Sequence, residues 1–286
     1  TLTDLNFYKE LSHRESTDRQ VATLKGSLLS IEDIASDLLQ FNRKEFPTYT
    51  CHGIQHSLRI LFNLDKILSK TFLENMEAIE IFCLIVAAIF HDSGMVNRDE
   101  DTQDEVREKH HQKSKSIVSE YFESHMKASF SDYERMGKTI QFIIESHMLD
   151  LNEMVNREEF ARNQTLNGGR VRINLLCVLL RVGDLLDMNE ERSCMQTVKL
   201  LPSKFNDDYS MDHINRHLNL EFYDLGENGI NIKAISKNKQ EHIIWTQWFD
   251  YLEMEILNAN TNIFKNELSL FKFPSVSLEV EKDSSS

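Results

Sequence analysis

The chain has 286 residues, a formal net charge of −14 and a hydrophobic fraction of 41%. This length fits one large domain or two small ones and is ample for a sizeable core. The acidic balance, without a basic stripe, disfavours a nucleic-acid-binding protein, and the longest apolar run, 79–90, is shorter than the roughly 20 residues that cross a bilayer. We therefore expect a soluble, cytoplasmic protein without a membrane partner.

Only 9 glycines and 3 prolines interrupt the chain, and its apolar residues recur at the spacing of amphipathic helices. A mainly α-helical fold is therefore predicted. The four cysteines are scattered without a CxxC pair, which favours reduced thiols over a disulfide framework. Helices are expected over 27–46, 54–70, 74–90, 103–123, 132–147, 171–186 and 241–257.

The helix expected over 74–90 is nearly apolar on all sides in its second half, which predicts a central position. It ends in His91 and Asp92, and Gly94 follows as a helix breaker. Composition alone accounts for one His-Asp dipeptide, so the pair gains weight only from its place and its neighbours.

The C-terminal part follows another pattern. Residues 218–223 and 230–235 alternate apolar with polar side chains around a Gly-rich turn at 224–229, which predicts a β-hairpin. The tail from Pro274 is polar, and we expect it to be mobile. These patterns divide the chain into an N-terminal helical extension (1–48), a core (49–192) and an α+β C-terminal extension with a mobile tail (193–286).

Several predicted helices carry a His or Asp near an end or on an apolar face. A charged carboxylate on such a face costs several kcal/mol unless it is paired or bound to a cation. Asp184 therefore needs a partner, and either Arg181 on the same helix or a divalent metal would serve. Imidazole and carboxylate ligands together suit Zn, Mn or Fe. Each histidine could instead be a hydrogen-bonded core residue. The members of this set are His56, His91, Asp92, His110 or His111, His147 and Asp184.

The order of these motifs resembles the HD superfamily of metal-dependent phosphohydrolases, and more closely the HD variant often joined to GHKL-type ATPase modules. The resemblance rests on Tyr-Thr-Cys-His-Gly-Ile-Gln-His-Ser-Leu-Arg-Ile (49–60), His-Asp-Ser-Gly-Met (91–95), Arg-Glu-Lys-His-His-Gln-Lys-Ser (107–114) and Leu-Arg-Val-Gly-Asp-Leu-Leu-Asp (180–187). It implies an HD-type helical bundle, here with a small C-terminal β-hairpin plus helix extension, and a metal among the helix ends.

The resemblance also implies roles for individual residues. One divalent ion (Mn, Mg, Fe or Zn) is expected, and two is the alternative. Two departures stand out, because binuclear members commonly have a His-His pair where this chain has His147 followed by Met148, and the Gly-Tyr-Pro motif of the branch that cleaves cyclic dinucleotides is absent. The implied ligands of the first metal are His56, His91, Asp92 and Asp184, and those of a second are His110 and His147.

Other histidines have less certain roles. His52 is either an accessory contact or a loop residue, and His111 points about 100° away from His110 on a helix. His213 and His217 have a ligand spacing on a short predicted helix, although a structural role is the simpler interpretation. The remaining histidines, which we interpret as surface or packing residues, are His13, His125 and His242.

The function expected from this resemblance is that of a metal-dependent phosphohydrolase, which attacks a nucleotide or another phosphoester, such as a phosphodiester, with metal-activated water. Asp92, His110 and His147 would be catalytic, and the substrate would be a phosphorylated small molecule or nucleotide. One alternative is a metal- or nucleotide-binding regulatory module of a larger multidomain protein that works with an ATPase domain. Another is a metal-dependent nuclease, which the net charge disfavours. The C-terminal extension could cap the site or form a homodimer face. Candidate substrate-binding cations are Arg59, Lys113 and Arg192.

Overall fold

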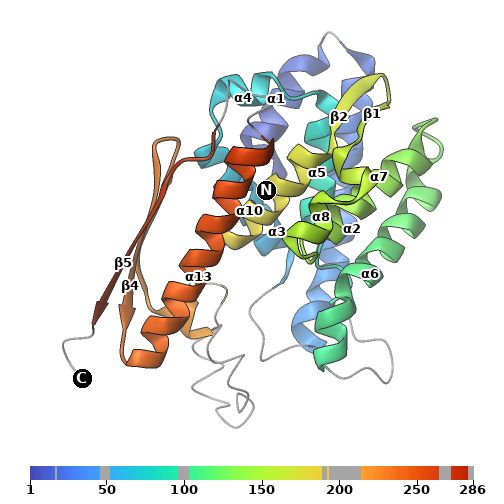
Figure 1. Cartoon of the computed structure of the whole chain (residues 1–286). Coiled ribbons are helices and arrows are strands. Elements are labelled where there is room, and N and C mark those ends of the chain that lie inside the picture. Colours follow the sequence, from blue (N-terminus) through green and yellow to red (C-terminus); the bar gives the residue numbers. More distant parts are fainter. Residues whose placement is uncertain are drawn as a thin grey trace.

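The computed structural model describes residues 1–16, 18–45, 52–95, 103–188, 192, 214–263 and 272–282. It is mainly α-helical, with a three-stranded sheet at one side (Figure 1). The predicted fold class, including the C-terminal strands and helix, is confirmed. The division into three domains stays a prediction.

The helices up to the central one are the following. A short turn, η1 (Leu2–Asp4), precedes α1 (Asn6–Glu15), α2 (Arg19–Glu45), α3 (Ile54–Ile67), α4 (Lys70–Glu74) and α5 (Ala78–Phe90). The helix predicted over 54–70 is thus divided in two. Leu68 is extended, and the Ser69 side chain accepts the Phe72 N–H at 3.2 Å, which caps the start of α4.

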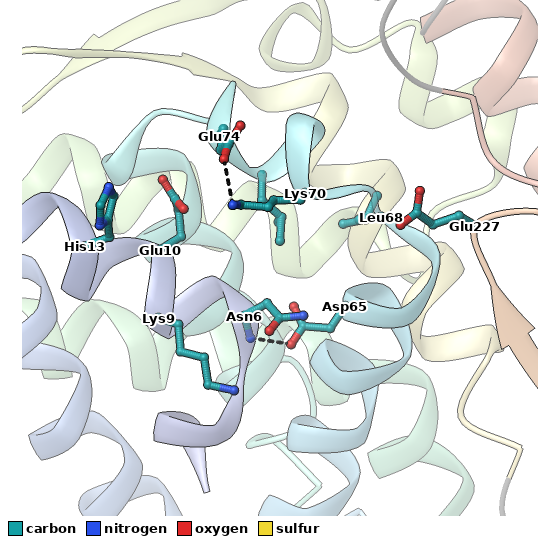
Figure 2. Close-up of a pocket in the computed structure, with 10 residues that line it drawn as sticks. Asn6, Lys9, Glu10, His13, Asp65, Leu68, Lys70, Glu74 and Glu227 are labelled. Atoms are coloured by element: carbon teal, nitrogen blue, oxygen red, sulfur yellow. Dashed lines mark hydrogen bonds and ion pairs between the residues drawn. The ribbon is translucent and has the colours of Figure 1, made fainter.

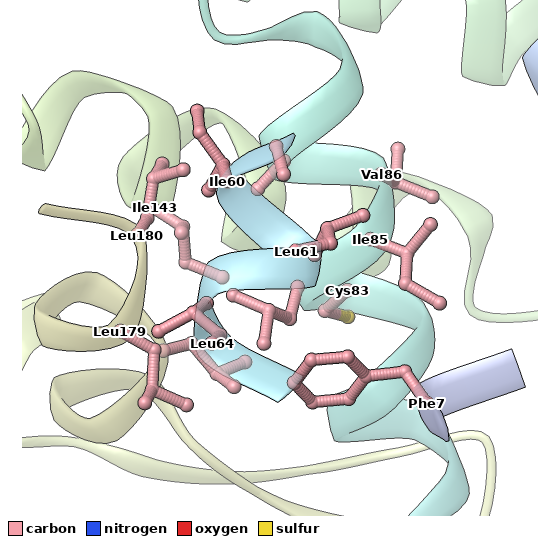
Figure 3. Packing of buried hydrophobic residues seen from close by; sticks show 14 of the residues in the cluster. Phe7, Ile60, Leu61, Leu64, Cys83, Ile85, Val86, Ile143, Leu179 and Leu180 are labelled. Atoms are coloured by element: carbon pink, nitrogen blue, oxygen red, sulfur yellow. The ribbon is translucent and has the colours of Figure 1, made fainter. Parts of the chain in front are cut away.

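The central helix is α5. From Ile79 to Phe90 every side chain is buried, so this helix has no polar face and must be covered on all sides. Helices α2, α3, α7 and α10 pack against it. Figure 3 shows the packing around α3 and α5, with the labelled side chains Phe7, Ile60, Leu61, Leu64, Cys83, Ile85, Val86, Ile143, Leu179 and Leu180. Each such large apolar side chain contributes about 1.5–3 kcal/mol on burial, so this core fixes the ends of its helices firmly.

The middle of the chain supplies the other helices around α5. They are α6 (Gln103–Tyr121), the π-helical segment η2 (Phe122–Met126), α7 (Tyr133–Ser146), α8 (Leu151–Val155), α9 (Glu158–Ala161) and α10 (Ile173–Leu185). The start of α10 is tied to the start of α5 by a buried ion pair, because Arg172 binds both carboxylate oxygens of Glu80 at 2.5 and 2.8 Å. This ion pair thereby holds the starts of α5 and α10 next to each other.

A small hairpin, β1 (Asn163–Leu166) and β2 (Gly169–Arg172), precedes α10. The sequence predicts a break at 167–169 but not the strands around it. Asn167 and Gly168 both have positive φ, 47° and 79°, as a two-residue type I′ turn requires. The strands are four residues long and mostly polar, so they have no clear alternation for a sequence pattern to reveal.

The C-terminal sheet has the order β3 (Leu220–Gly226), β4 (Gly229–Ser236) and β5 (Val276–Lys282). The antiparallel β3–β4 hairpin is the predicted one. For residues 276–282 the expectation of a mobile tail from Pro274 is wrong, because β5 pairs in parallel with β4 from Val276 to Lys282. From 276 to 280 every second residue of β5 is apolar and half-buried, namely Val276, Leu278 and Val280.

Helix α13 (Lys239–Asn258), followed by η5 (Ala259–Ile263), joins this sheet to the bundle. It contacts β4, β5 and α10, and the rings of Trp245 and Trp248 meet edge to face with centroids 5.7 Å apart. Cys83 and Cys177 are buried and unpaired, and burial raises the pKa of the Cys177 thiol to about 12. Within the described ranges, no helix has the length and apolarity needed to cross a membrane.

Candidate metal centre

Five helices place histidine and aspartate side chains at one point in the bundle. Ligand atoms from these side chains form three overlapping groups, and within each group all atoms lie within 4.8 Å of one another. The predicted residues that meet here are His56 on α3, His91 and Asp92 at the end of α5, His110 on α6, His147 at the end of α7 and Asp184 in the last turn of α10.

His56, His91 and Asp184 form one of these groups, and with the adjacent Asp92 they are called the first group below; it has the donor set of a transition-metal site. The Nε2 atoms of His56 and His91 are 3.2 Å apart. An oxygen of Asp184 lies 3.2 Å from His56 Nε2 and 3.9 Å from His91 Nε2. Oδ2 of Asp92 lies 3.4 Å from His56 Nε2 and 3.1 Å from His91 Nε2. Two imidazoles and two carboxylates suit borderline divalent ions.

The other ring nitrogens support this interpretation. Nδ1 of His91 donates to the Ala88 carbonyl at 2.9 Å, and Nδ1 of His56 donates to Asp187 Oδ2 at 2.6 Å. A neutral imidazole that donates from Nδ1 has a lone pair on Nε2. Two lone pairs therefore face each other beside two carboxylate oxygens, and only a cation or a proton between them makes this arrangement favourable. The residues present fit a divalent metal.

The second group consists of Asp92, His110 and His147, and the two histidines lie on the other side of the Asp92 carboxylate. Oδ1 of Asp92 is 3.2 Å from His110 Nε2 and 3.9 Å from His147 Nε2, and these two nitrogens are 3.1 Å apart. Nδ1 of His147 bonds the Ile144 carbonyl, which again leaves Nε2 with its lone pair. The carboxylate of Asp92 thus presents Oδ2 to the first group and Oδ1 to the second, so it would hold a cation on either side.

The pKa values of His56 in the first group and His147 in the second shift in opposite directions. Burial lowers the pKa of His56, but hydrogen bonds to three carboxylates outweigh burial and raise it to about 10. Burial and the neighbouring His91 and His110 lower the pKa of His147 to about 3. Burial alone would raise the pKa of Asp184, yet the hydrogen bond from His56 holds it well below its usual range. Without a metal, a proton on His56 balances the carboxylates, and a bound cation would displace that proton.

Asp187 binds the nitrogen of His56 that faces away from the first group. It was not among the predicted site residues. Its side chain is buried and accepts from His56 Nδ1 at 2.6 Å and from Arg59 Nε at 2.8 Å. Arg192 Nε lies 3.6 Å from the same carboxylate. The spacing Asp-Leu-Leu-Asp, which puts Asp187 one turn beyond Asp184, is the signal that could have indicated it. Arg59 and Arg192 thus both have a partner in Asp187, and their contact with substrate stays a prediction.

His52 contacts the centre directly. Its Nδ1 lies 2.6 Å from Asp92 Oδ2, and its side chain is 19% exposed. His52 is therefore an accessory contact of the centre, the first of the two roles that the sequence left open. His111 lies in none of the three groups. His217 is buried on the helical segment 214–218, outside the groups, and His213 lies outside the described residues.

Gly94 allows α6 to approach the end of α5. A Cβ at Gly94 would lie 2.0 Å from the carbonyl oxygen of His110. Ser114 fixes the same contact, because its hydroxyl donates to the His91 carbonyl at 2.7 Å and accepts from the Gly94 N–H at 2.8 Å. Lys113, half-buried on this helix, lies next to Gly94, and its role toward substrate stays a prediction.

Arg181 does not pair with Asp184. Its guanidinium pairs with Glu255 on α13, with Nε 3.0 Å from Oε2, and also donates to the Leu149 carbonyl at 2.8 Å and to the Ser146 carbonyl. These carbonyls flank His147. Arg181 therefore secures the end of α7, and Asp184 is left to the histidines of the first group.

A cavity of about 420 Å³ lies far along α3 from His56, between α1, α3 and α4 (Figure 2). Asp65 lies on its wall, with Oδ2 2.6 Å from the Asn6 N–H. Both acidic and basic side chains line it, and none of the residues of the metal centre does.

The HD-CE family model matches residues 46–258, which covers most of the chain and all residues of the centre. No curated protein and no solved structure matches the chain.

Proposed function

The chain belongs to the HD-CE family, and on this premise we propose that it is a metal-dependent phosphohydrolase, which cleaves a nucleotide or another phosphoester by attack of water on phosphorus. The observation that carries the proposal is the convergence of two imidazole lone pairs, on His56 and His91, with oxygens of Asp92 and Asp184. A divalent ion held there would polarise a phosphoryl oxygen and lower the pKa of a nearby water.

The side chains of the centre have distinct tasks in this proposal. Asp92 and Asp184 supply the negative charge that a divalent ion requires, and Asp92 accepts from His52 at 2.6 Å, which holds its carboxylate in one orientation. His110 and His147, which contact the other oxygen of Asp92, would hold a second ion or a phosphate oxygen.

In this proposal the substrate reaches the centre on the side of Asp184. The side chain of Asp184 is 30% exposed, whereas those of His56 and His91 are fully buried. A phosphoester would therefore approach past Asp184, the more exposed of these side chains.

The test combines metal analysis with an activity panel. We expect the purified chain to contain a divalent metal and to release phosphate from, or cleave, at least one nucleotide, phosphomonoester or phosphodiester when supplied with Mn, Mg, Fe or Zn. The variant Asp92→Ala should lose both the metal and the activity. Asp250→Ala, the same change at an exposed position on α13, is the matched control.

Equal activity of the wild type and Asp92→Ala, or a wild type that binds no metal, would refute the proposal. Metal and nucleotide binding without turnover would instead support a regulatory module, and metal-dependent degradation of single-stranded DNA or RNA a nuclease. An ATPase partner and a homodimer stay predictions.

A further inference from the structure

A second cleft, separate from the metal centre, lies between α6, α7 and α9. Its volume is about 410 Å³, within the range of small-molecule sites. One face of α7 forms most of its wall, and β1 and the start of α10 close it. None of the residues in the three ligand groups lines this cleft.

The residues that line this cleft have a net positive charge, whereas the chain as a whole has a net negative one. The chain has a formal charge of −14, yet four cations and only two carboxylates line the cleft. Cations that gather in one hollow repel one another, and a bound anion would relieve that repulsion. The charged lining residues are Lys115, Arg135, Lys138 and Arg162 with Glu145 and Glu159.

The cations differ in what they already contact. Lys115 Nζ lies 2.6 Å from Glu145, and Arg135 donates to the Thr165 carbonyl at 3.0 Å. Lys138 and Arg162 are exposed, and their side chains have no hydrogen-bond or ion-pair partner among the described residues. An ammonium and a guanidinium that share a cleft are the groups that bind phosphate best, one as a point charge and the other as a fork.

From these contacts we propose that the cleft binds the phosphate group of a small phosphate ester. Phe142 and Ile173 add apolar lining beside the cations, which gives the organic part of an ester a place to pack. The site goes beyond the proposed function, because it uses none of the metal ligands and requires no catalysis.

The cleft also adjoins the two helices that carry the second ligand group. The Lys115–Glu145 ion pair joins α6 to α7, as His110 and His147 do at 3.1 Å. An anion near Lys115 competes with Glu145 for its ammonium, so occupation of the cleft acts on the contact between these helices.

The experiment uses the full chain after removal of divalent metal by a chelator. Phenyl phosphate and inorganic phosphate are titrated by calorimetry into the wild type and into the double variant Lys138→Ala/Arg162→Ala. We expect binding of one phenyl phosphate per chain, tighter than that of inorganic phosphate, and at least a tenfold loss of affinity in the variant. The matched control is Lys237→Ala/Lys239→Ala, which removes the same net charge from exposed positions around the start of α13 and should bind as the wild type does.

Three results would overturn the proposal. The first is equal affinity of the wild type and the cleft variant, or no binding by the wild type. The second is loss of binding in His110→Ala but not in the cleft variant, which would place the phosphate at the metal centre. The third is tighter binding of a hexaglutamate peptide than of phenyl phosphate, which would assign the cleft to an acidic protein segment. A thermal melt of each variant confirms that it is folded.

Discussion

Nδ1 of His56 donates a hydrogen bond to Oδ2 of Asp187 at 2.6 Å, and both side chains are buried. This bond fixes the imidazole so that its other nitrogen, Nε2, points at Asp92 and Asp184. A carboxylate behind a ligating histidine orients the ring and raises its basicity. Asp187 therefore orients a ligand of the first metal position without being a ligand itself.

Asp187→Asn should weaken metal binding by roughly 10–100-fold, the usual effect of losing such a support. The amide keeps the shape of the side chain but removes the charge that favours donation from His56. Metal affinity would be measured by competition with a chromogenic chelator. Asp250→Asn, at an exposed position, is the control, and an unchanged affinity in Asp187→Asn would show that this bond does not orient His56.

The division of the Asp92 carboxylate between two groups predicts two metal positions. His147→Gln should reduce the metal content by about one ion per chain and leave the first position filled, because Nε2 of His147 faces His110 and Oδ1 of Asp92, at 3.1 and 3.9 Å. His56→Gln should abolish the first position. Elemental analysis after dialysis against a defined Mn concentration provides the measurement. A wild type with one ion, unchanged in His147→Gln, would show that Met148 marks a mononuclear site.

Gly94→Ala should destabilise the protein strongly, since the new Cβ would lie 2.0 Å from the His110 carbonyl oxygen and 2.7 Å from the Ser114 nitrogen. Both obstacles are backbone atoms, so relief requires α6 to move away from α5. We expect a loss of at least about 3 kcal/mol, the upper part of the range for overpacking, together with loss of metal at the second position.

Gly26→Ala is the matched control for this prediction. Gly26 lies within α2, and a Cβ there would meet nothing within 4 Å. The same substitution should therefore stabilise the protein by about 0.5–1 kcal/mol, the helix preference of alanine over glycine. Urea unfolding of both variants gives the comparison, and similar stabilities would contradict the close approach at Gly94.

The site was predictable where it depends on local pattern, and not where distant segments meet. His91 and Asp92 follow a run of apolar residues, and Asp184 ends another, so both helix ends could be located from periodicity. The strand β5 could not, because its partner β4 lies about 40 residues earlier and the alternation of Val276, Leu278 and Val280 is short. The cleft with Lys138 and Arg162 draws on several elements, and no single segment shows it.

Asp65 predicts a pH dependence of stability that is independent of the metal centre. Burial raises the pKa of its carboxyl to about 6 from a usual value of 3.8, although it accepts from the backbone N–H of Asn6. Its Oδ1 is buried without a hydrogen-bond partner in the described part of the chain. The folded protein thus binds this proton more tightly than the unfolded chain does, so the contribution of Asp65 to stability is fully present below pH 3.8 and is lost as the pH rises to about 6.

Asp65→Asn removes this titration and keeps an oxygen that accepts from Asn6. The variant should gain stability over the wild type as the pH rises through this window, by about 2 kcal/mol in all, because each pKa unit corresponds to about 1.4 kcal/mol and partial exposure reduces the total. Urea unfolding at several pH values between 3.5 and 7, roughly one unit beyond the window at its upper end, measures the difference. Asp250→Asn, which is exposed, should show no such trend, and a difference that stays constant with pH in Asp65→Asn would mean that the carboxyl of Asp65 titrates normally.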